Sequence, residues 1–292
     1  MQLIITQKPD YEFLGGPKHK GFTVNLNGES YDIDIDQIGK RTITISTTSS
    51  NYNGTLSVFY SLETLLMLFD GHFYPVERAF DGADITASWK ERSLSCYSSA
   101  DFMLDSKNRL IEFDAVLDEP LFHKWLALKK ELDIVHNMVL YCLSSVKMPK
   151  DMQCAFMVET FIGICELVAK MDVSFVVPSV PKRDSKLKYY FLAVAERYGA
   201  DIFAEEFSRN RDTFAQILVN SRNRIAHIKS RQGRVYLNGE ESVFYMMKLS
   251  LLYRVVLFDL LGIPSSKYEN ALLSRVQKVN DHTVIKDFLN TL

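Results

Sequence analysis

The chain has 292 residues, which is enough for one large domain or two of ordinary size. Apolar residues make up 47% and charged residues 24% of the sequence, and this composition excludes disorder or collagen as the main architecture. The formal net charge is −2, from 34 basic and 36 acidic side chains. Because no global charge excess exists, any surface for a polyanion has to be a local patch.

The first hundred residues predict a β-rich region. Runs of β-branched and aromatic residues recur at four places, 3–6, 22–26, 31–35 and 42–46. Asn27-Gly28 stands between two of these runs and is typical of a type I′ hairpin turn. Asp32, Asp34 and Asp36 alternate with isoleucines, and the glycine and glutamate of a calcium-binding loop are missing, so they are predicted to form the exposed face of a strand.

Two further elements are predicted before the chain changes character. A short helix is expected over 61–69, with Ser61 as its N-cap and Gly71 just beyond its end. A return to strand is expected within 85–97. We therefore predict a β-rich N-terminal domain over 1–112.

From about residue 115 the apolar residues follow a helical period, with almost no strand signal. Five helices are predicted, over 120–146, 151–170, 185–199, 203–220 and 240–261. Ser266 and Glu269 match a capping box for a sixth, and Asn280 or Asp281 can cap a seventh. Short connections between long amphipathic helices favour antiparallel neighbours. The predicted fold class is thus α+β, with an all-α antiparallel helical bundle over 113–292.

Cysteine spacing and apolar segments favour a reduced, cytoplasmic protein. The chain has four cysteines, which fit neither a C-x-x-C pair nor a zinc finger: Cys96, Cys142, Cys154 and Cys165. We predict that they are reduced, buried thiols. The N-terminus lacks the pattern of a signal peptide. The most apolar stretch, 154–168, is too short to span a bilayer and contains Glu159 and Glu166, so no membrane partner is expected.

Several catalytic signatures are absent from the sequence. It contains no phosphate-binding loop, no dinucleotide fingerprint, no nucleophile elbow and no H-E-x-x-H zinc motif. We therefore predict no cofactor and no metal. Of the six histidines, His136 lies in the apolar run IVHNMVLYCL and is predicted to be a hydrogen-bonded core or interface histidine.

One polar constellation stands out, in the stretch NSRNRIAH over 220–227. Arg222 precedes His227 by five positions, and Asn223 follows the arginine. Histidine titrates near neutral pH and can transfer protons, whereas arginine is always charged and can bind two phosphate oxygens. RNA brings its own nucleophile, the 2′-hydroxyl, so these residue types suit its cleavage.

The spacing also predicts how the three side chains are arranged. Asn223 is four positions before His227, so on a helix the two share a face, and the asparagine can orient the imidazole or contact phosphate. Arg222 and His227 lie roughly 140° apart on an ideal helix. A helix end or a second protomer would therefore help them to converge on one phosphate.

Basic residues concentrate around this constellation. From 208 to 234 the chain has seven basic residues and one acid, Asp212, a local net charge of +6. A patch of this kind attracts a polyanion, although a solvated basic face without a ligand is the alternative. The predicted RNA contacts are Arg209, Arg211, Arg224, Lys229, Arg231 and Arg234.

Two acidic residues interrupt the apolar helix predicted over 151–170. Glu159 and Glu166 are seven positions apart and therefore share one face. The favoured interpretation is that they mark the exposed face of that helix. The alternative is that one of them pairs with an arginine of the basic cluster.

The motif residues Arg222, Asn223 and His227 resemble the hallmark of the HEPN superfamily, an arginine and a polar residue followed a few positions later by a histidine. The wider pattern, SRNRIAH followed by RVYLNGEESVFYMMKLSLLYRVVLFDLLGIP, is similar to the ApeA-like HEPN subgroup, which also has a β-rich N-terminal domain. The resemblance implies metal-independent RNA cleavage that leaves 2′,3′-cyclic phosphate and 5′-hydroxyl ends, with the motifs of two protomers facing each other. It also implies roles in abortive infection, toxin–antitoxin pairs and antiviral defence.

We accordingly predict an endoribonuclease with Arg222, Asn223 and His227 as catalytic residues and RNA as its partner. A homodimer through the helical domain is expected because 243–261 has more apolar surface than one bundle face needs, and a regulatory or antitoxin protein is a further expected partner. Two alternatives stay open: a non-catalytic module of the same fold that binds RNA, a nucleotide or a protein, and an unrelated helical scaffold with a chance motif. A buried His227 and a structural salt bridge at Arg222 would favour the scaffold.

Overall fold

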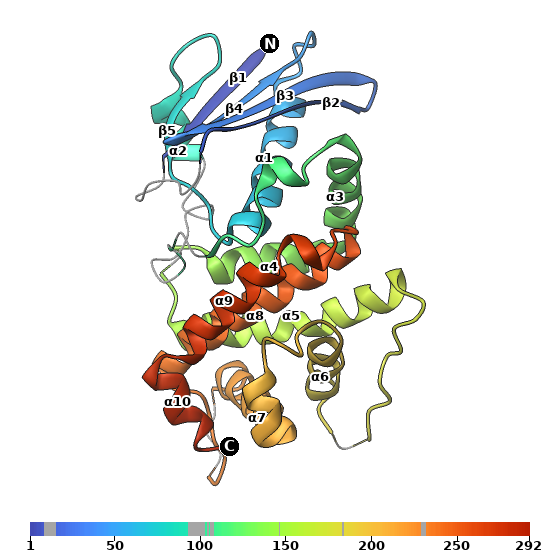
Figure 1. Ribbon diagram of the computed structural model, residues 1–292, viewed down its shortest axis with the longest axis vertical. Coiled ribbons are helices and arrows are strands. Elements are labelled where there is room, and N and C mark those ends of the chain that lie inside the picture. The colour runs from blue at the N-terminus through green and yellow to red at the C-terminus, as the bar shows by residue number, and fades with distance from the viewer. Residues whose placement is uncertain are drawn as a thin grey trace. The chain divides into compact units, whose positions relative to one another are not determined.

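The computed structural model describes residues 1–8, 16–92, 103, 105, 108–145, 147–182, 184–228 and 232–292. These residues form two compact units, Met1–Leu128 and Lys129–Leu292. An antiparallel sheet is the main feature of the first unit, and the second is helical (Figure 1). The α+β class predicted from the sequence is confirmed.

The sheet of the first unit has five strands in the order β2-β3-β4-β1-β5, and all neighbours are antiparallel. The strands are β1 (Gln2–Gln7), β2 (Lys18–Leu26), β3 (Glu29–Ile38), β4 (Lys40–Ser46) and β5 (Val76–Phe80). The first four match the predicted runs. Asn27 and Gly28 have φ of 53° and 82°, as the predicted type I′ turn requires. Asp32, Asp34 and Asp36 are exposed, which confirms the solvated strand face.

Helix α1 (Tyr52–Asp70) begins well before the predicted start at residue 61. The Asn51 side chain accepts a hydrogen bond from the Gly54 amide, so it caps the helix, and the Asn-Gly pair that resembles a turn lies in the first helical turn. Ser61, the predicted N-cap, is buried inside the helix. The predicted end is confirmed, since Gly71 has φ of 81° and donates its amide hydrogen bond to the Met67 carbonyl.

Helix α1 covers the buried face of the sheet. Gln7 of β1 donates to Glu63 of α1 (3.0 Å), and Arg41 of β4 donates to Asp70 (2.7 Å) at the helix end. The isoleucines of β3 and β4 that alternate with exposed residues are almost fully buried on the same face. The sheet and α1 therefore enclose one apolar core.

The segment after the sheet differs from the prediction. Thr86–Arg92 forms helix α2 where strand was predicted over 85–97, and residues 93–97 lie outside the described part of the chain. The Asp84 side chain accepts a hydrogen bond from the Thr86 amide at the start of this helix. Strand β5 was not predicted, because its sequence VERAF lacks a clear apolar alternation.

Helix α3 (Glu119–Leu132) follows a short 3₁₀ turn (Phe113–Ala115) and explains where the two units divide. Trp125 donates its indole hydrogen bond to the Ser61 carbonyl (2.7 Å), and Phe122 packs edge-on against Phe22. The first half of α3 thus belongs to the first unit. The division falls between 128 and 129, beyond the domain boundary at 112/113 expected from the sequence, which stays a prediction.

The helix predicted over 120–146 is two helices. Asp133 adopts a left-handed φ of 43° and interrupts it between α3 and α4. The second unit then contains α4 (Ile134–Leu143), α5 (Lys150–Met171), α6 (Lys186–Tyr198), α7 (Ala204–Ala226), α8 (Gly239–Leu260), α9 (Glu269–Asn280) and α10 (Thr283–Leu289). Two predicted caps are wrong. Ser266 lies in a 3₁₀ turn that precedes α9, and α10 is capped by His282 rather than by Asn280 or Asp281.

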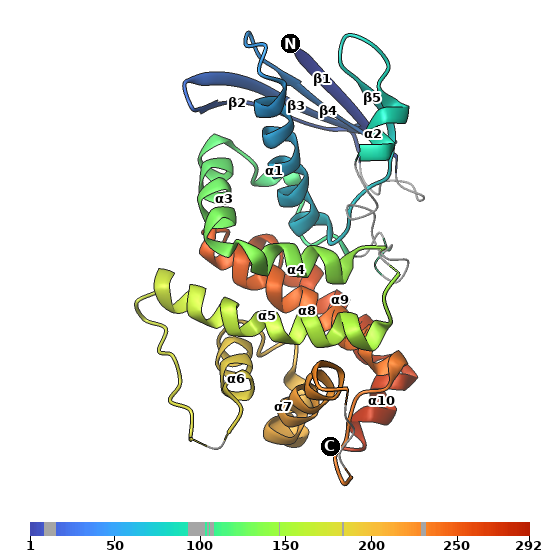
Figure 2. The ribbon, with the colours of Figure 1, turned by 180° about the vertical axis from the view of Figure 1, so that it is seen from behind.

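Helices α5 and α8 form the centre of the second unit (Figures 1 and 2). Helix α5 contacts α4, α6, α7 and α8, while α8 also contacts α6, α9 and α10. Leu251, Val255 and Phe258 of the apolar stripe on α8 are buried within the unit. The stripe therefore builds this core and leaves no surplus face on that part of the helix, so the homodimer has to be argued from other residues.

Helix α5 is long and apolar enough to cross a membrane, and it is the one candidate in the described chain. Its most apolar window is 61% buried within the unit, as expected for a central helix. Cys154 and Cys165 lie on this helix and, like Cys142, are buried free thiols. Burial raises the pKa of Cys142 and Cys154 to about 12. The prediction for these three cysteines is confirmed, and Cys96 lies outside the described residues.

His136 is a core residue, as predicted. Its side chain is 1% exposed, and its Nδ1 lies 2.8 Å from the Tyr253 hydroxyl, with which it hydrogen-bonds. Burial lowers the pKa of His136 to about 3, so the imidazole is neutral at physiological pH.

Candidate functional site

The motif lies on the last turns of α7, which extends six residues beyond the predicted end at residue 220. The helix is broken at Asn210, which has φ of −161° and ψ of 90°, and the Asn210 side chain accepts a hydrogen bond from the Thr213 amide. A new helical segment begins there and continues to Ala226. His227 is the C-cap, so the histidine stands at a helix end.

The His227 side chain is exposed and forms no hydrogen bond or ion pair with another described residue, whereas the His227 backbone N–H donates to the Asn223 carbonyl (3.1 Å). Gln216, Asn220, Asn223 and His227 are spaced by four, three and four residues, so they form one stripe along α7. Arg222 lies on a different side of the helix, because positions 222 and 227 are roughly 140° apart on an ideal helix. A buried His227 would have favoured an unrelated scaffold with a chance motif. The exposed side chain does not fit that alternative.

Arg222 is held by two polar side chains. Its Nε lies 2.6 Å from Glu159 Oε2 on α5, and its Nη1 donates to Asn223 Oδ1 (2.9 Å). The Arg222 and Glu159 side chains are 26% and 30% exposed, so this ion pair is partly shielded from water. A guanidinium has five N–H donors, and three remain for a phosphate after these two contacts.

The two glutamates of α5 therefore play different roles. Glu159 pairs with an arginine of the basic cluster, which was the alternative interpretation. Glu166 pairs with Lys186 (2.7 Å) on the exposed surface, in agreement with the favoured one. Glu159 contacts Arg222, and the candidate site predicted from the sequence did not include it. Its position on the same apolar helix as Glu166 gave no signal to separate them.

The predicted RNA contacts lie at both ends of α7. Arg209 is exposed near the break, and Arg211 pairs with Glu196 and Asp212. At the other end, the Arg224 guanidinium lies 5.4 Å from the centre of the Tyr236 ring, and Arg234 donates to Asn220 (3.3 Å). Lys229 and Arg231 lie outside the described residues.

The local charge is smaller than the sequence suggests. Glu159 and Glu196 come from other helices and pair with Arg222 and Arg211. Asp212 pairs with Lys188 of α6 (3.2 Å) as well as with Arg211. Among the described residues of 208–234, the basic side chains without an ion pair are Arg209 near the break and Arg224 and Arg234 beside the motif, and these are the ones free to attract a polyanion.

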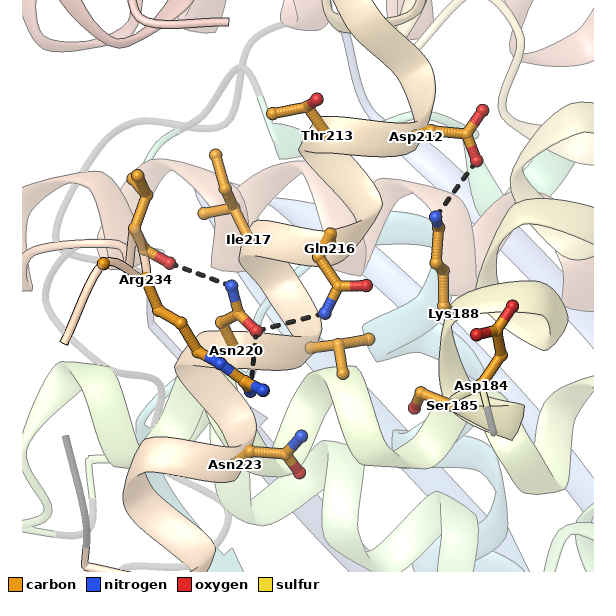
Figure 3. A pocket seen from close by; sticks show the side chains of 13 residues that line it. Asp184, Ser185, Lys188, Asp212, Thr213, Gln216, Ile217, Asn220, Asn223 and Arg234 are labelled. Atoms are coloured by element: carbon orange, nitrogen blue, oxygen red, sulfur yellow. Dashed lines mark hydrogen bonds and ion pairs between the residues drawn. The ribbon is translucent and has the colours of Figure 1, made fainter. Parts of the chain in front are cut away.

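A pocket of about 800 Å³ lies beside the motif, and Asn223 is part of its wall (Figure 3). It is formed by the start of α6, the stripe of α7 and the segment 233–235. The lining residues are Asp184, Ser185, Lys188, Asp212, Thr213, Gln216, Ile217, Val219, Asn220, Asn223, Gly233, Arg234 and Val235.

Asn220 fixes this wall. It is 6% exposed, its Oδ1 accepts hydrogen bonds from Gln216 (3.1 Å) and Arg234 (3.3 Å), and its Nδ2 donates to the Val235 carbonyl (3.3 Å). Ser221 Oγ accepts from the Leu237 amide (2.8 Å). These bonds attach 234–237 to α7, so the pocket is held open without a ligand.

Sequence reasoning did not identify the pocket. The available signal was the polar stripe of Gln216, Asn220, Asn223 and His227 on a helix that is otherwise apolar at its centre. Lys188 was not identifiable, because α6 precedes the motif by more than twenty residues. Within the described residues, no three His, Cys, Asp or Glu side chains are grouped to hold a metal ion.

Comparison with protein families assigns this part of the chain. Residues 181–267 match the family model described as Apea-like HEPN. The match contains α6, α7 and α8, and with them the whole motif. The chain therefore carries an Apea-like HEPN domain, as its sequence resemblance predicted, and this domain supports a nuclease-type or HEPN-module function in broad terms. No curated protein and no solved structure gave a significant match to the chain.

Proposed function

We propose that this protein is a cytoplasmic endoribonuclease that cleaves RNA without a metal ion or cofactor, in antiviral defence or as a toxin. The observation that carries this proposal is the arrangement at the end of α7. An exposed histidine follows an arginine whose guanidinium is held by Glu159 and Asn223, with three N–H donors left for phosphate. The Apea-like HEPN match over the same residues supports it.

The chemistry needs only these groups and the RNA. His227 accepts the proton of the 2′-hydroxyl while the O2′–P bond forms, and returns it to O5′ as the P–O5′ bond breaks. Arg222 binds the non-bridging oxygens and stabilises the charge of the pentavalent phosphate. The products are a 2′,3′-cyclic phosphate and a 5′-hydroxyl. Asn223 shares the stripe of His227 and orients Arg222 through its Oδ1.

The arrangement on one helix favours a composite site. Because Arg222 and His227 point in different directions, the arginine of one copy and the histidine of another can meet one phosphate more readily than both from a single chain. We therefore propose a homodimer through the helical unit. A regulatory or antitoxin protein that covers the motif is the partner that such an enzyme needs in the cell.

A structural salt bridge at Arg222 was expected of an unrelated scaffold with a chance motif, and the ion pair between Arg222 and Glu159 meets that expectation. Because residues 181–267 match the Apea-like HEPN model, the ion pair instead supports a second function within that fold. In a non-catalytic module this pair would be structural, and the surface around Arg224 and Arg234 would bind RNA, a nucleotide or a protein without cleavage. The two functions differ in what His227 does, so the histidine is the residue to change.

The direct experiment is cleavage of total RNA by the full chain and its variants, with end-group analysis for the cyclic phosphate. His227→Ala is expected to lower the rate by about 10²–10⁴, the usual cost of losing a general acid–base group. Arg222→Ala should be comparably severe, and Asn223→Ala milder. EDTA should not inhibit the wild type. His123→Ala, another exposed histidine, on α3, is the matched control and should retain activity.

Several outcomes would contradict the proposal. Cleavage that persists in His227→Ala, or that requires Mg²⁺ in the wild type, would remove the mechanism. A wild type that binds RNA and does not cleave it, with or without a co-expressed trigger, would favour the non-catalytic module.

Mixing two inactive variants tests the composite site. If Arg222 and His227 of different copies work together, a mixture of Arg222→Ala and His227→Ala chains forms heterodimers with one intact pair, and part of the activity returns. A mixture as inactive as each variant alone would place both residues of a working site on one chain. Light scattering that shows only a 33.5 kDa monomer at micromolar concentration would count against the dimer itself.

A further inference from the structure

The pocket between α6 and α7 lies in line with the catalytic histidine. Gln216, Asn220 and Asn223 belong to the stripe of α7 that ends at His227. Along the helix axis, Asn223 is about 6 Å and Asn220 about 10 Å from His227, at about 1.5 Å per residue. If an RNA strand places one phosphate at His227, its adjacent nucleotide therefore lies beside this pocket.

The size and construction of the pocket fit a small polar ligand. Its volume of about 800 Å³ lies within the usual range for ligand sites in proteins. The walls are helices α6 and α7, and the remaining side, formed by 233–235, is attached to α7 through Asn220. Such a preformed cavity can select a ligand by shape and hydrogen bonding, because little ordering is needed on binding.

Two amide side chains of the pocket retain hydrogen-bonding groups for a ligand. Gln216 uses its Nε2 toward Asn220, and its Oε1 has no partner among the described residues. Asn223 uses its Oδ1 toward Arg222, and its Nδ2 is likewise unused. Figure 3 shows both amides extending from α7 toward the side where Lys188 and Ser185 lie. One acceptor and one donor at this spacing are the groups that read the edge of an unpaired base.

The opposite wall can hold a phosphate. The Lys188 side chain is 18% exposed and pairs with Asp212, which is 59% exposed and also contacts Arg211, so a bound phosphate would compete with Asp212 for the lysine. Lys188 lies in the first turn of α6, where its own amide donates to the Ser185 carbonyl (3.0 Å) and Ser185 makes no side-chain capping bond. Arg234 supplies a second cation on the 233–235 side.

From this arrangement we infer that the pocket is a subsite for one nucleotide of the RNA strand, the nucleotide adjacent to the cleaved phosphodiester. Gln216 and Asn223 contact its base, and Lys188 contacts its phosphate. The pocket thereby makes cleavage selective for the base at that position. This inference rests on the proposed function, because the nuclease reaction defines which phosphodiester the bound nucleotide adjoins.

The first test measures binding of nucleoside 5′-monophosphates by titration calorimetry with the full chain. At least one of the four monophosphates is expected to bind saturably. Lys188→Ala should weaken this binding about tenfold, the effect of one lost charge-assisted contact. Lys186→Ala on the same helix is the matched control, because Lys186 pairs with Glu166 outside the pocket and should have no effect. The inference is overturned if no monophosphate binds, or if Lys188→Ala and Lys186→Ala behave alike.

The second test uses Gln216→Met, which keeps the length of the side chain and removes both its unused acceptor and its Nε2 donor to Asn220. Asn220 keeps its hydrogen bonds with Arg234 and with the Val235 carbonyl, which hold the wall of the pocket. In the wild type one base should be favoured over the others, both among the monophosphates and beside the cleaved bonds of a random-sequence RNA. The variant should lose that preference while it retains the thermal unfolding temperature of the wild type. An unchanged preference would show that the base is not read by this residue and would overturn its role.

The tests separate failure of the subsite from failure of the nuclease. Monophosphate binding that depends on Lys188, in a protein that never cleaves RNA, would leave the pocket assigned and refute the nuclease. RNA cleavage that depends on His227, with no effect of Lys188→Ala or Gln216→Met on affinity or base preference, would leave the nuclease and refute the subsite.

Discussion

The ion pair between Arg222 and Glu159 gives the sharpest test of how the arginine is positioned. Glu159→Gln keeps the shape of the side chain and changes a charge-assisted contact into a neutral one. The two groups lie at ion-pair distance without a hydrogen bond at Glu159 Oε2, and fully exposed ion pairs contribute about 0.2–1 kcal/mol. Because both side chains are less than one-third exposed, we expect the free energy of unfolding to fall by about 1–1.5 kcal/mol.

Glu166→Gln is the matched control, because the residue lies on the same helix and pairs with Lys186. Both side chains of that pair are about half exposed, at 54% and 49%. Exposed pairs contribute about 0.2–1 kcal/mol, so this variant should lose about 0.5 kcal/mol or less. Urea unfolding of both variants and the wild type at one pH, with comparable m-values, measures the difference.

The same substitution predicts a change in RNA affinity. A phosphate bound on the free side of the Arg222 guanidinium would lie roughly 6 Å from the Glu159 carboxylate, where two unit charges repel by about 1 kcal/mol at an effective dielectric constant between those of protein and water. Removing the carboxylate charge should therefore tighten binding of a short single-stranded RNA about fivefold, measured in the His227→Ala background so that no cleavage occurs. Equal stability losses for Glu159→Gln and Glu166→Gln, together with unchanged RNA affinity, would refute the reasoning.

Two further predictions concern the core of the helical unit. Burial holds the pKa of His136 at about 3, whereas the histidine of an unfolded chain binds its proton near pH 6.5, so lowering the pH from 6.5 toward 3 should reduce the free energy of unfolding by up to about 1.4 kcal/mol per pH unit. In urea unfolding, the stability difference between the wild type and His136→Gln should therefore shrink over that range. A constant difference would contradict the assignment. Lys248 and Glu206 are both fully buried, with Nζ and Oε1 2.6 Å apart. Lys248→Met should lower the free energy of unfolding by about 3–5 kcal/mol, because it leaves an unpaired buried carboxylate. Adding Glu206→Gln should restore much of that loss in the same assay.

Local patterns in the sequence predict the sheet well, because the residues that determine each strand face and turn are only a few positions apart. The alternation of isoleucine with polar residues sets which side of β3 and β4 is buried, and Asn27-Gly28 supplies the two left-handed residues of the hairpin. The start of α1 is different. Asn53-Gly54 is a turn signal by itself, but the burial of Thr55, Val58 and Phe59 against the rest of the unit favours a helix there. Tertiary packing overrides the local preference at this place.

The candidate site was predictable only in part, for the same reason. The motif residues stand together in the sequence, so their type and spacing indicate their chemistry. The partners of the charged residues on α7 come from elsewhere: Glu159 of α5 contacts the motif residue Arg222, while Glu196 and Lys188 of α6 contact Arg211 and Asp212. A local count of charges cannot include such partners, and it therefore overstated the positive charge along α7.

The surface for a second copy can be sought from the same geometry. The second half of the apolar stripe of α8 (Leu251, Val255 and Phe258) is buried, whereas two apolar side chains after the end of α7 are exposed to water: Ile228 is 95% exposed with a left-handed φ of 48°, and Val235 is 55% exposed. Ile228 follows His227 directly in the chain, and we propose that its exposed side chain contributes to the contact with a second copy. In the proposed composite site, an RNA strand would lie along the pocket side of one α7, and its phosphate would meet the Arg222 of the other copy. Ile228→Asp should then dissociate the dimer in light scattering and lower cleavage together, whereas a change in only one of the two would separate this surface from the active site.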